Sequence, residues 1–251
     1  MAAGGRGHLG PAFSLVEILT VFFEKILKYD PKNPLWPDRD RLILSKGHGC
    51  LALYAMLARK GYFSEKELSL FCKTEGILGG HPDHRKVPGI EASTGSLGHG
   101  LSLGIGMALA ARLHKRPSNV YVILGDGECN EGSVWEGALS AAKHKLTNLV
   151  VLVDYNKMQS YSFTKDVIDL EPFADKWKSF GFETREVNMD HPKDLEGLLS
   201  DLPFGKDKPS AVICHTIKGK GISFAENNPN WHHKSKLSEE EIKNLLEELR
   251  D

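Results

Sequence analysis

The sequence predicts an α/β protein with a doubly wound, mostly parallel sheet and helices on both faces. Three short and almost wholly apolar runs, at 120–124, 149–153 and 210–214, predict buried strands. Segments with helical spacing of apolar residues separate these runs, and such alternation is typical of a parallel sheet covered on both faces. Because 251 residues suit one α/β domain, we expect a single domain over residues 1–251.

The N-terminal part is expected to be helical. An amphipathic helix is predicted before Asp30-Pro31 because apolar residues recur there at helical spacing: Leu15, Ile18, Leu19, Phe22 and Ile26. Residues 51–60 predict a second helix, and the capping box over 64–67 predicts the start of a third. Glycine and proline are frequent from 74 to 100, which indicates loops, and a helix of small residues follows to about Arg112.

The strands are expected to alternate with further helices. Apolar spacing predicts helices at 133–144, 173–180 and about 193–199, with a weaker strand at 183–187 between the last two. A serine and a glutamate three residues apart, Ser238 and Glu241, predict the start of a C-terminal helix.

Composition excludes several classes of partner. The chain has 32 basic and 33 acidic residues, so it has no positive surplus for nucleic acid or an anionic membrane. Its N-terminus has no signal-peptide pattern, and no apolar run is long enough to span a bilayer. The four cysteines show no metal-ligand spacing and are expected to be reduced thiols. We therefore expect a soluble, cytoplasmic protein.

Polar residues follow two of the predicted strands. Gly125-Asp126-Gly127-Glu128 comes directly after the strand at 120–124, and Asp154-Tyr155-Asn156 comes after the strand at 149–153. Ligands bind at the carboxyl ends of parallel strands, where Asp126 and Asn156 should lie close together. Their oxygens, with the backbone carbonyl of Met158, suit Mg²⁺, whose shell is usually completed by water and phosphates. Gly125 and Gly127 would let a bulky anion approach the backbone. The pattern therefore predicts a magnesium–diphosphate site.

Gly125-Asp126-Gly127, followed after 28 residues by Asn156, resembles the signature of thiamine-diphosphate enzymes. Nearly the whole chain is similar to one family of them, the transketolases, and especially to the separate N-terminal subunit of split transketolases. The similar segments occur in the family's order: Gly7–Gly10, Ser45–His48, Gly80–Pro82, Ser93–Gly98, Gly125–Gly132, Asp154–Met158, Lys218–Gly221 and His232-His233. The resemblance implies thiamine diphosphate and Mg²⁺ as cofactors.

Transketolases transfer a two-carbon ketol unit from a ketose phosphate to an aldose phosphate, which requires groups that exchange protons near neutral pH. The resemblance assigns His48 to the diphosphate and proton-transfer region, and His8 and His81 to the substrate channel. One of His232 and His233 would be a fourth member, and we favour His232.

The resemblance also implies how the cofactor is held. Gly95 and Leu97 would line it, and Gly127 would donate a backbone N–H group to the diphosphate. Gly125 and Glu128 belong to the same cofactor-binding turn.

The chain is expected to hold half of a catalytic site. In the family, the glutamate that activates the cofactor's aminopyrimidine ring comes from a second, pyrimidine-binding domain, and this sequence stops soon after the expected N-terminal domain. We therefore expect a separate C-terminal subunit, in an α₂β₂ assembly. Glu131 and Glu136 match positions near that interface.

The sequence departs from the family's pattern at two places. It begins almost directly at Gly7-His8, where relatives usually carry another helix. The usual glycine-rich turn after Asn156 is replaced by the segment 159–163, Gln-Ser-Tyr-Ser-Phe, which leaves the donor and acceptor sugars open.

Two other motifs and two other functions compete with these expectations. Gly100-Leu-Ser102-Leu-Gly104 fits the nucleophile elbow of α/β-hydrolases, but no buried strand precedes it. A zinc site around His81, Asp83 and His84 lacks further ligands. Another thiamine-diphosphate enzyme is possible, such as one similar to deoxyxylulose-phosphate synthase or the alpha subunit of a 2-oxo-acid dehydrogenase, and so is a non-catalytic cofactor-binding subunit.

Overall fold

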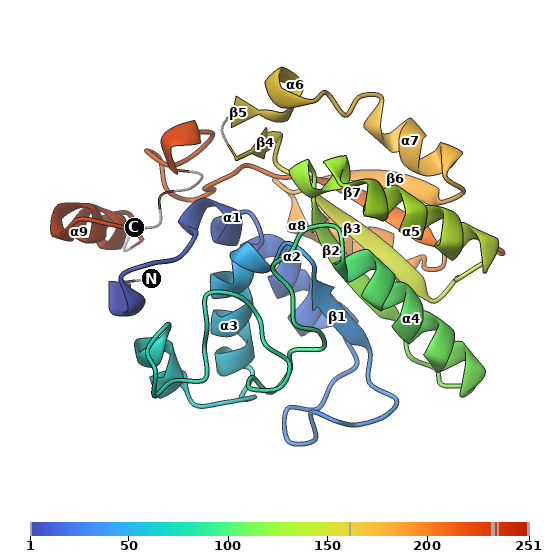
Figure 1. Cartoon of the computed structure of the whole chain (residues 1–251), viewed down its shortest axis with the longest axis horizontal. Coiled ribbons are helices and arrows are strands. Elements are labelled where there is room, and N and C mark those ends of the chain that lie inside the picture. The colour runs from blue at the N-terminus through green and yellow to red at the C-terminus, as the bar shows by residue number, and fades with distance from the viewer. Residues whose placement is uncertain (1, 161, 232–233, 235, 250–251) are drawn as a thin grey trace.

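The computed structural model describes residues 2–160, 162–231, 234 and 236–249, and its centre is a five-stranded parallel sheet (Figure 1). The strand order is β1-β2-β3-β7-β6, and every neighbouring pair is parallel. The strands are β1 (Arg41–Leu44), β2 (Val120–Gly125), β3 (Leu149–Tyr155), β6 (Glu183–Asn188) and β7 (Ser210–His215). The predicted fold class is confirmed.

Helices cover both faces of the sheet (Figure 1). On one face lie α2 (Val16–Val21), α3 (Cys50–Arg59) and α8 (Pro192–Ser200). The short helix α1 (Leu9–Phe13) contacts α3 and packs with Ile222, Ala225 and Leu245 in a smaller, separate cluster. On the other lie α4 (Gly100–Leu113), α5 (Gly132–Lys143) and α7 (Phe173–Ser179). The remaining elements are the short β4 (Met158–Gln159), β5 (Ser162–Phe163) and α6 (Thr164–Val167), and the C-terminal α9 (Glu239–Glu248). No helix among the described residues is long and apolar enough to cross a membrane.

Three local predictions differ from the structure. Neither β1, a strand of only four residues, nor the β4–β5 hairpin was predicted from the sequence. The first predicted helix begins earlier, at Leu9, is interrupted at Ser14-Leu15 and ends in a π-helical turn, Phe22–Ile26. The predicted third helix is a 3₁₀ helix, Glu65–Leu70, because Ser64 caps only Lys66 and the box is not closed. The capping box at Ser238 and Glu241 is present.

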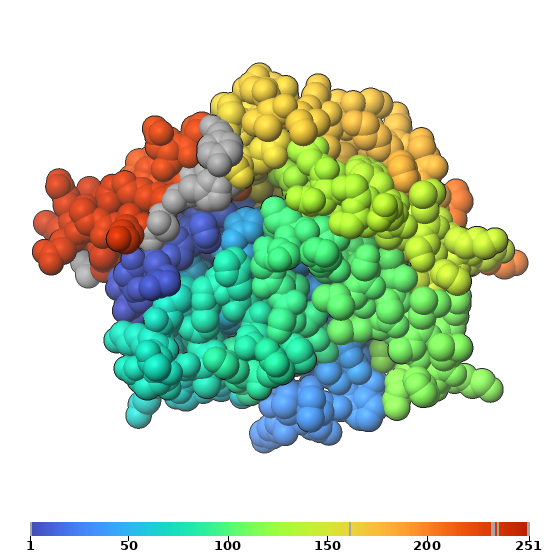
Figure 2. Space-filling view, in the orientation of Figure 1, coloured from blue at the N-terminus to red at the C-terminus, as the bar shows by residue number. Residues whose placement is uncertain are grey.

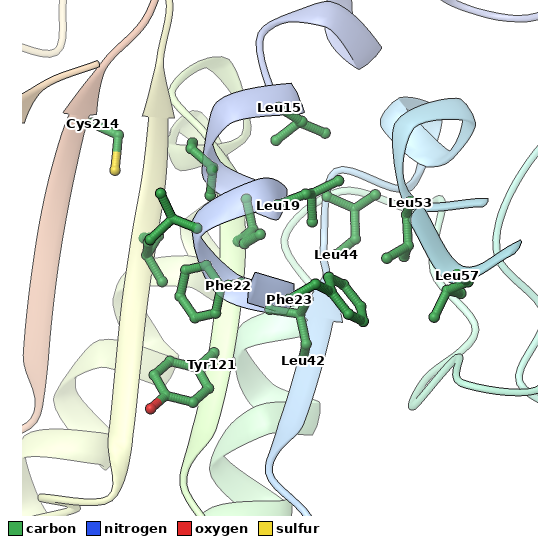
Figure 3. Close-up of a cluster of buried hydrophobic side chains, with 14 of the residues drawn as sticks. Leu15, Leu19, Phe22, Phe23, Leu42, Leu44, Leu53, Leu57, Tyr121 and Cys214 are labelled. Carbon is green, nitrogen blue, oxygen red and sulfur yellow. The ribbon is translucent and has the colours of Figure 1, made fainter. Parts of the chain in front are cut away.

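The first core lies between the sheet and the N-terminal helices. Alternate residues of each strand point to one face, so β2 contributes Tyr121 and Ile123 to this side. Figure 3 shows Leu19 of α2 and Phe22 of the π-helical turn lying between the strands, which contribute Leu42 and Tyr121, and α3, which contributes Leu53. This packing fixes the segment that begins at His8 against the end of β1.

The segment that joins α3 to α4 has no strand or α-helix between residues 71 and 99. It runs across the surface of the molecule between those two helices (Figure 2). It is anchored where Arg39 makes a two-point ion pair with the mostly buried Glu91, at 2.7 Å for each contact. The predicted loop is therefore an ordered strap that carries His81, Gly95 and Leu97.

Helix α4 packs closely on β2 through one glycine. A Cβ atom at Gly104 would lie 2.4 Å from Cγ2 of Val122, whereas one at Gly106, half a turn away, would meet no atom within 4 Å. Ser102 is exposed, and no strand leads directly into this helix, because residues 71–99 contain none. The Gly100–Gly104 pattern therefore reflects helix–sheet packing, and the hydrolase interpretation is not supported.

We expect Gly104→Ala to destabilise the protein by about 1–3 kcal/mol, because the added methyl group must displace α4 from the sheet. Gly106→Ala is the matched control: it adds the same group to the same helix in open space and should stabilise by about 0.5–1 kcal/mol. Urea unfolding followed by circular dichroism measures both changes. Equal effects at the two positions would contradict the packing.

Candidate functional site

Polar residues follow the carboxyl ends of four parallel strands, so they lie at the same edge of the sheet. Lys46 follows β1, Asp126 follows β2, Asn156 follows β3 and Lys218 lies three residues beyond β7. The register pairs Gly125 with Asp154, so the loops after β2 and β3 begin side by side. The expectation that Asp126 and Asn156 share one sheet edge agrees with this topology.

Backbone N–H groups hold the two predicted metal ligands in place. Asp126 accepts hydrogen bonds from the backbone of Gly127 at 2.9 Å and of Lys157 at 2.6 Å. The side-chain oxygen of Asn156 accepts one from the backbone of Met158 at 3.1 Å. All three predicted ligand residues are buried. The oxygens are therefore oriented by the backbone before any cation binds.

A cavity of about 240 Å³ lies at this edge. All the predicted site residues within the described part of the chain line it: His8, His48, His81, Gly95, Leu97, Gly125, Asp126, Gly127, Glu128, Asn156 and Met158. His232 and His233 lie outside the described residues. The cavity wall also includes four residues for which the sequence predicted no role: Lys46, Gln159, Ser160 and Lys218.

The three histidines reach the cavity from three separate segments. The rings of His8 and His48 meet edge to face, with centroids 5.7 Å apart. The ring of His81 lies against Gly95, where a Cβ atom would be 3.0 Å from its Cδ2. A side chain at position 95 would press on the imidazole, and its backbone φ of +153° is one that residues with a side chain rarely adopt.

A buried ion pair joins the strand ends below the cavity. The ammonium of Lys46 contacts the carboxylate of Asp154, and both side chains are almost fully buried. Ser14 donates to the same carboxylate at 2.6 Å, and the hydroxyl of Thr216 donates to its other oxygen. Burial raises the pKa of Asp154, but Lys46 and these hydrogen bonds outweigh it, so the net pKa falls below its usual value. Asp154 is thus ionised.

Lys218 is a second buried lysine, beside Asp126. Among the described residues its ammonium makes no hydrogen bond or ion pair. Burial lowers the pKa of Lys218, and the nearby Lys46 adds to this effect. Burial also raises the pKa of Asp126, with a contribution from Asp154. An anion beside Lys218 and a cation beside Asp126 would each favour the ionised form of its neighbour.

The carboxylate of Glu128 is held by hydrogen bonds from three segments of the chain. Its carboxylate accepts hydrogen bonds from the hydroxyl of Ser45 and from the backbone of Gly98 at 2.9 Å and Gly125 at 3.0 Å. Burial raises the pKa of Glu128, while these donors oppose the rise. Its side chain therefore joins the ends of β1 and β2 to the strap, and direct contact with a cofactor stays a prediction.

The alternative zinc site is not supported. No group of three or more histidine, cysteine or acidic side chains in the described part of the chain is placed to hold a metal ion. Asp83 instead accepts hydrogen bonds from the backbone of Arg85 and the hydroxyl of Ser93. A wider groove of about 910 Å³ adjoins the cavity and shares Asn156, but none of the three predicted histidines lines it.

The donor set fits a diphosphate bound through a divalent cation. Carboxylate, amide and carbonyl oxygens are suitable ligands for Mg²⁺. Lys218 offers a buried positive charge, and the same wall holds the buried side-chain Nε2 of Gln159, which has no hydrogen-bond partner among the described residues. A cation and an anion can therefore be accommodated together.

Residues 1–250 match the family described as "Transketolase, thiamine diphosphate binding domain". The chain is 42% identical over 245 residues to the 6-deoxy-6-sulfo-D-fructose transketolase subunit SqwG of Clostridium sp. (strain MSTE9), covering 98% of this chain and 89% of that protein. It is 44% identical to an apulose-4-phosphate transketolase subunit from Actinobacillus succinogenes, covering 98% of this chain and 88% of that protein.

Among solved structures, transketolase from Campylobacter jejuni superposes with a TM-score of 0.91 at 30% identity. The match covers 98% of this chain but only 39% of that one.

Fold and family match together define a thiamine-diphosphate-binding domain. Within that class, the chain belongs to the transketolase family, and it corresponds to the N-terminal subunit of a split transketolase.

We expect Lys46→Met to destabilise the protein by about 3–5 kcal/mol, because it leaves the charge of Asp154 buried without its partner. The double variant Lys46→Met/Asp154→Leu should be less destabilised than the sum of the two single variants. Chemical denaturation of the unaltered protein, the two single variants and the double variant gives the coupling free energy between Lys46 and Asp154.

The matched control is the exposed pair Lys145–Asp207, at 3.4 Å with both side chains 63% exposed. Lys145→Met should change the free energy of unfolding by less than about 1 kcal/mol. A similarly small effect at Lys46 would show that the buried pair is not what joins the strand ends.

Proposed function

We propose that this chain binds Mg²⁺ and the diphosphate of thiamine diphosphate, and catalyses ketol transfer between sugar phosphates together with a second subunit. The observation that carries the proposal is the meeting of Asp126, Asn156, Lys218 and the histidines in one cavity at the sheet edge. The whole chain acts as a single domain of the diphosphate-binding type.

Asp126, Asn156 and the backbone carbonyl of Met158 hold the Mg²⁺ ion. The backbone N–H group of Gly127, which donates to Asp126 in this structure, is proposed to be shared with the diphosphate. Lys218 contributes positive charge to the diphosphate. Gly95 and Leu97 shape the wall of the same cavity. The buried setting strengthens each of these interactions, because the local dielectric is lower than in water.

The bound cofactor supplies an electron sink for cleavage of a carbon–carbon bond beside a ketone. The chain's own histidines hold and move the protons. His8 and His81 come from different segments of the cavity wall and can face the hydroxyl groups of a sugar, whereas His48 is beside His8. His232 is proposed as a fourth member on family resemblance alone.

The partner is a C-terminal transketolase subunit that supplies the pyrimidine-binding half of the site, in an α₂β₂ assembly. Two relatives that match over 88% or more of their length are each named as one subunit of a transketolase. Glu131 and Glu136 are exposed at the start of α5, where they are available to contact that subunit. The four free cysteines are compatible with a cytoplasmic location.

The purified chain should be inactive alone and should catalyse ketol transfer from xylulose 5-phosphate when mixed with a C-terminal transketolase subunit that completes the site. Both subunits are needed because each provides half of the cofactor site. A coupled assay with thiamine diphosphate and Mg²⁺ measures the rate. Full turnover by the single chain, or inactivity of the complex with every ketose phosphate despite bound cofactor, would overturn the proposal.

Asp126→Asn should weaken cofactor binding to the complex by more than roughly 100-fold, since even outer-shell partners of a metal typically contribute 10–100-fold. Removing Mg²⁺ with EDTA should have a comparable effect on the unaltered protein and little further effect on the variant. Asp207→Asn, a substitution on the surface, is the control and should bind normally. Binding is measured by isothermal titration calorimetry.

A further inference from the structure

The segment that replaces the usual glycine-rich turn contributes residues to a short pair of strands beside the cavity. Met158 pairs with Phe163 and Gln159 with Ser162 in the antiparallel strands β4 and β5. Gln159 lies on the cavity wall. The departure from the family's pattern therefore places the amide side chain of Gln159 beside the predicted diphosphate site. The sequence predicted no role for this residue.

Gln159 is held against the turn that carries Asp126. A Cβ atom at Gly127 would lie 2.6 Å from the Cβ and 3.3 Å from the Oε1 atom of Gln159. The close neighbour that requires a glycine at position 127 is thus this side chain. Gln159 sits one residue beyond the predicted metal ligand Met158, and both residues line the cavity.

The two ends of the Gln159 amide have different surroundings. Its Oε1 accepts a long hydrogen bond of 3.4 Å from the side chain of Asn130. Its Nε2 is buried and has no hydrogen-bond partner among the described residues. A buried donor without an acceptor costs free energy that a ligand can recover.

The carboxylates that share the cavity wall with this donor are already engaged. Asp126 accepts two backbone N–H groups, and Glu128 accepts three donors. Gln159 lines the same cavity as Gly127 and Lys218. With Oε1 held by Asn130, Nε2 is the group that a ligand in this cavity could engage. A ligand rich in acceptor oxygens is what this arrangement of a donor and a buried ammonium would bind.

We propose that Gln159 donates a hydrogen bond from Nε2 to the diphosphate of the bound cofactor. This inference rests on the proposed function, because it requires a diphosphate in the cavity. Asn130 is a positioning residue for the amide: it holds Oε1 and leaves Nε2 for the ligand. The hydrogen bond is charge-assisted, so its loss should be measurable in cofactor affinity.

The test compares three variants in the two-subunit complex. Gln159→Met keeps the length and the packing on Gly127 but removes the donor, and Gln159→Glu keeps the shape but adds a negative charge. Asn130→Ala removes the orienting contact alone. The affinity for thiamine diphosphate is measured by calorimetry, and inorganic diphosphate with Mg²⁺ is used as a competing ligand. Thermal unfolding of the cofactor-free complexes checks that each variant is folded.

Gln159→Met should weaken both thiamine diphosphate and inorganic diphosphate by roughly 10- to 100-fold. Gln159→Glu should weaken both further, and Asn130→Ala should have a smaller effect of a few-fold. Unchanged affinities in a folded Gln159→Met complex would overturn the inference and leave the proposed function intact. Weakened thiamine diphosphate with unchanged inorganic diphosphate would also overturn it, because the contact would then be to another part of the cofactor. Failure of the unaltered complex to bind thiamine diphosphate would instead overturn the proposed function, and this inference with it.

Discussion

The ion pair between Lys46 and Asp154 is the interaction on which the candidate site depends. Lys46 follows β1 and Asp154 lies at the end of β3, while Thr216 after β7 and Ser14 after α1 donate to the same carboxylate. A buried carboxylate with this many partners fixes the relative positions of the segments that supply them, since each unmade contact would leave a buried polar group unsatisfied. Asn156 and Lys218 each follow one of these anchored positions by two residues.

A second connection completes the frame around the cavity. Glu128 links Ser45 to the backbone of Gly98 and Gly125, so the strap after α3 is attached to the same strand ends. The histidines come from three segments far apart in sequence, and two of these segments meet the two carboxylates: His48 follows Lys46, and His81 lies on the strap. The positions of these histidines are therefore set by buried acidic residues that do not themselves need to contact a substrate.

The sequence predicted the parts of this arrangement that depend on periodicity and turns. Runs such as 149–153 are buried on both faces, so apolar composition alone identified them. The four-residue β1 was missed because Leu42-Ile-Leu44 is too short to stand out, although its place before Ser45–His48 was a usable signal. Lys46 and Lys218 occur within the family's motifs but were given no role, because a lysine in a loop is usually exposed, and only the fold shows that both are buried. The same is true of Gln159, whose orphaned Nε2 depends on how the hairpin packs on Gly127.

The charges around the cavity also determine which combination of ligands it can bind. Asp126 and Lys218 are buried close to Lys46 and Asp154, and burial disfavours the charged form of each. A cation alone would stabilise ionised Asp126 but add repulsion toward the two lysines, and an anion alone would do the reverse toward the two carboxylates. Only a cation and an anion bound together stabilise the ionised forms of Asp126 and Lys218 at once. The protein thus provides a strongly polarised cavity, in which Mg²⁺ and a diphosphate should each increase the affinity for the other.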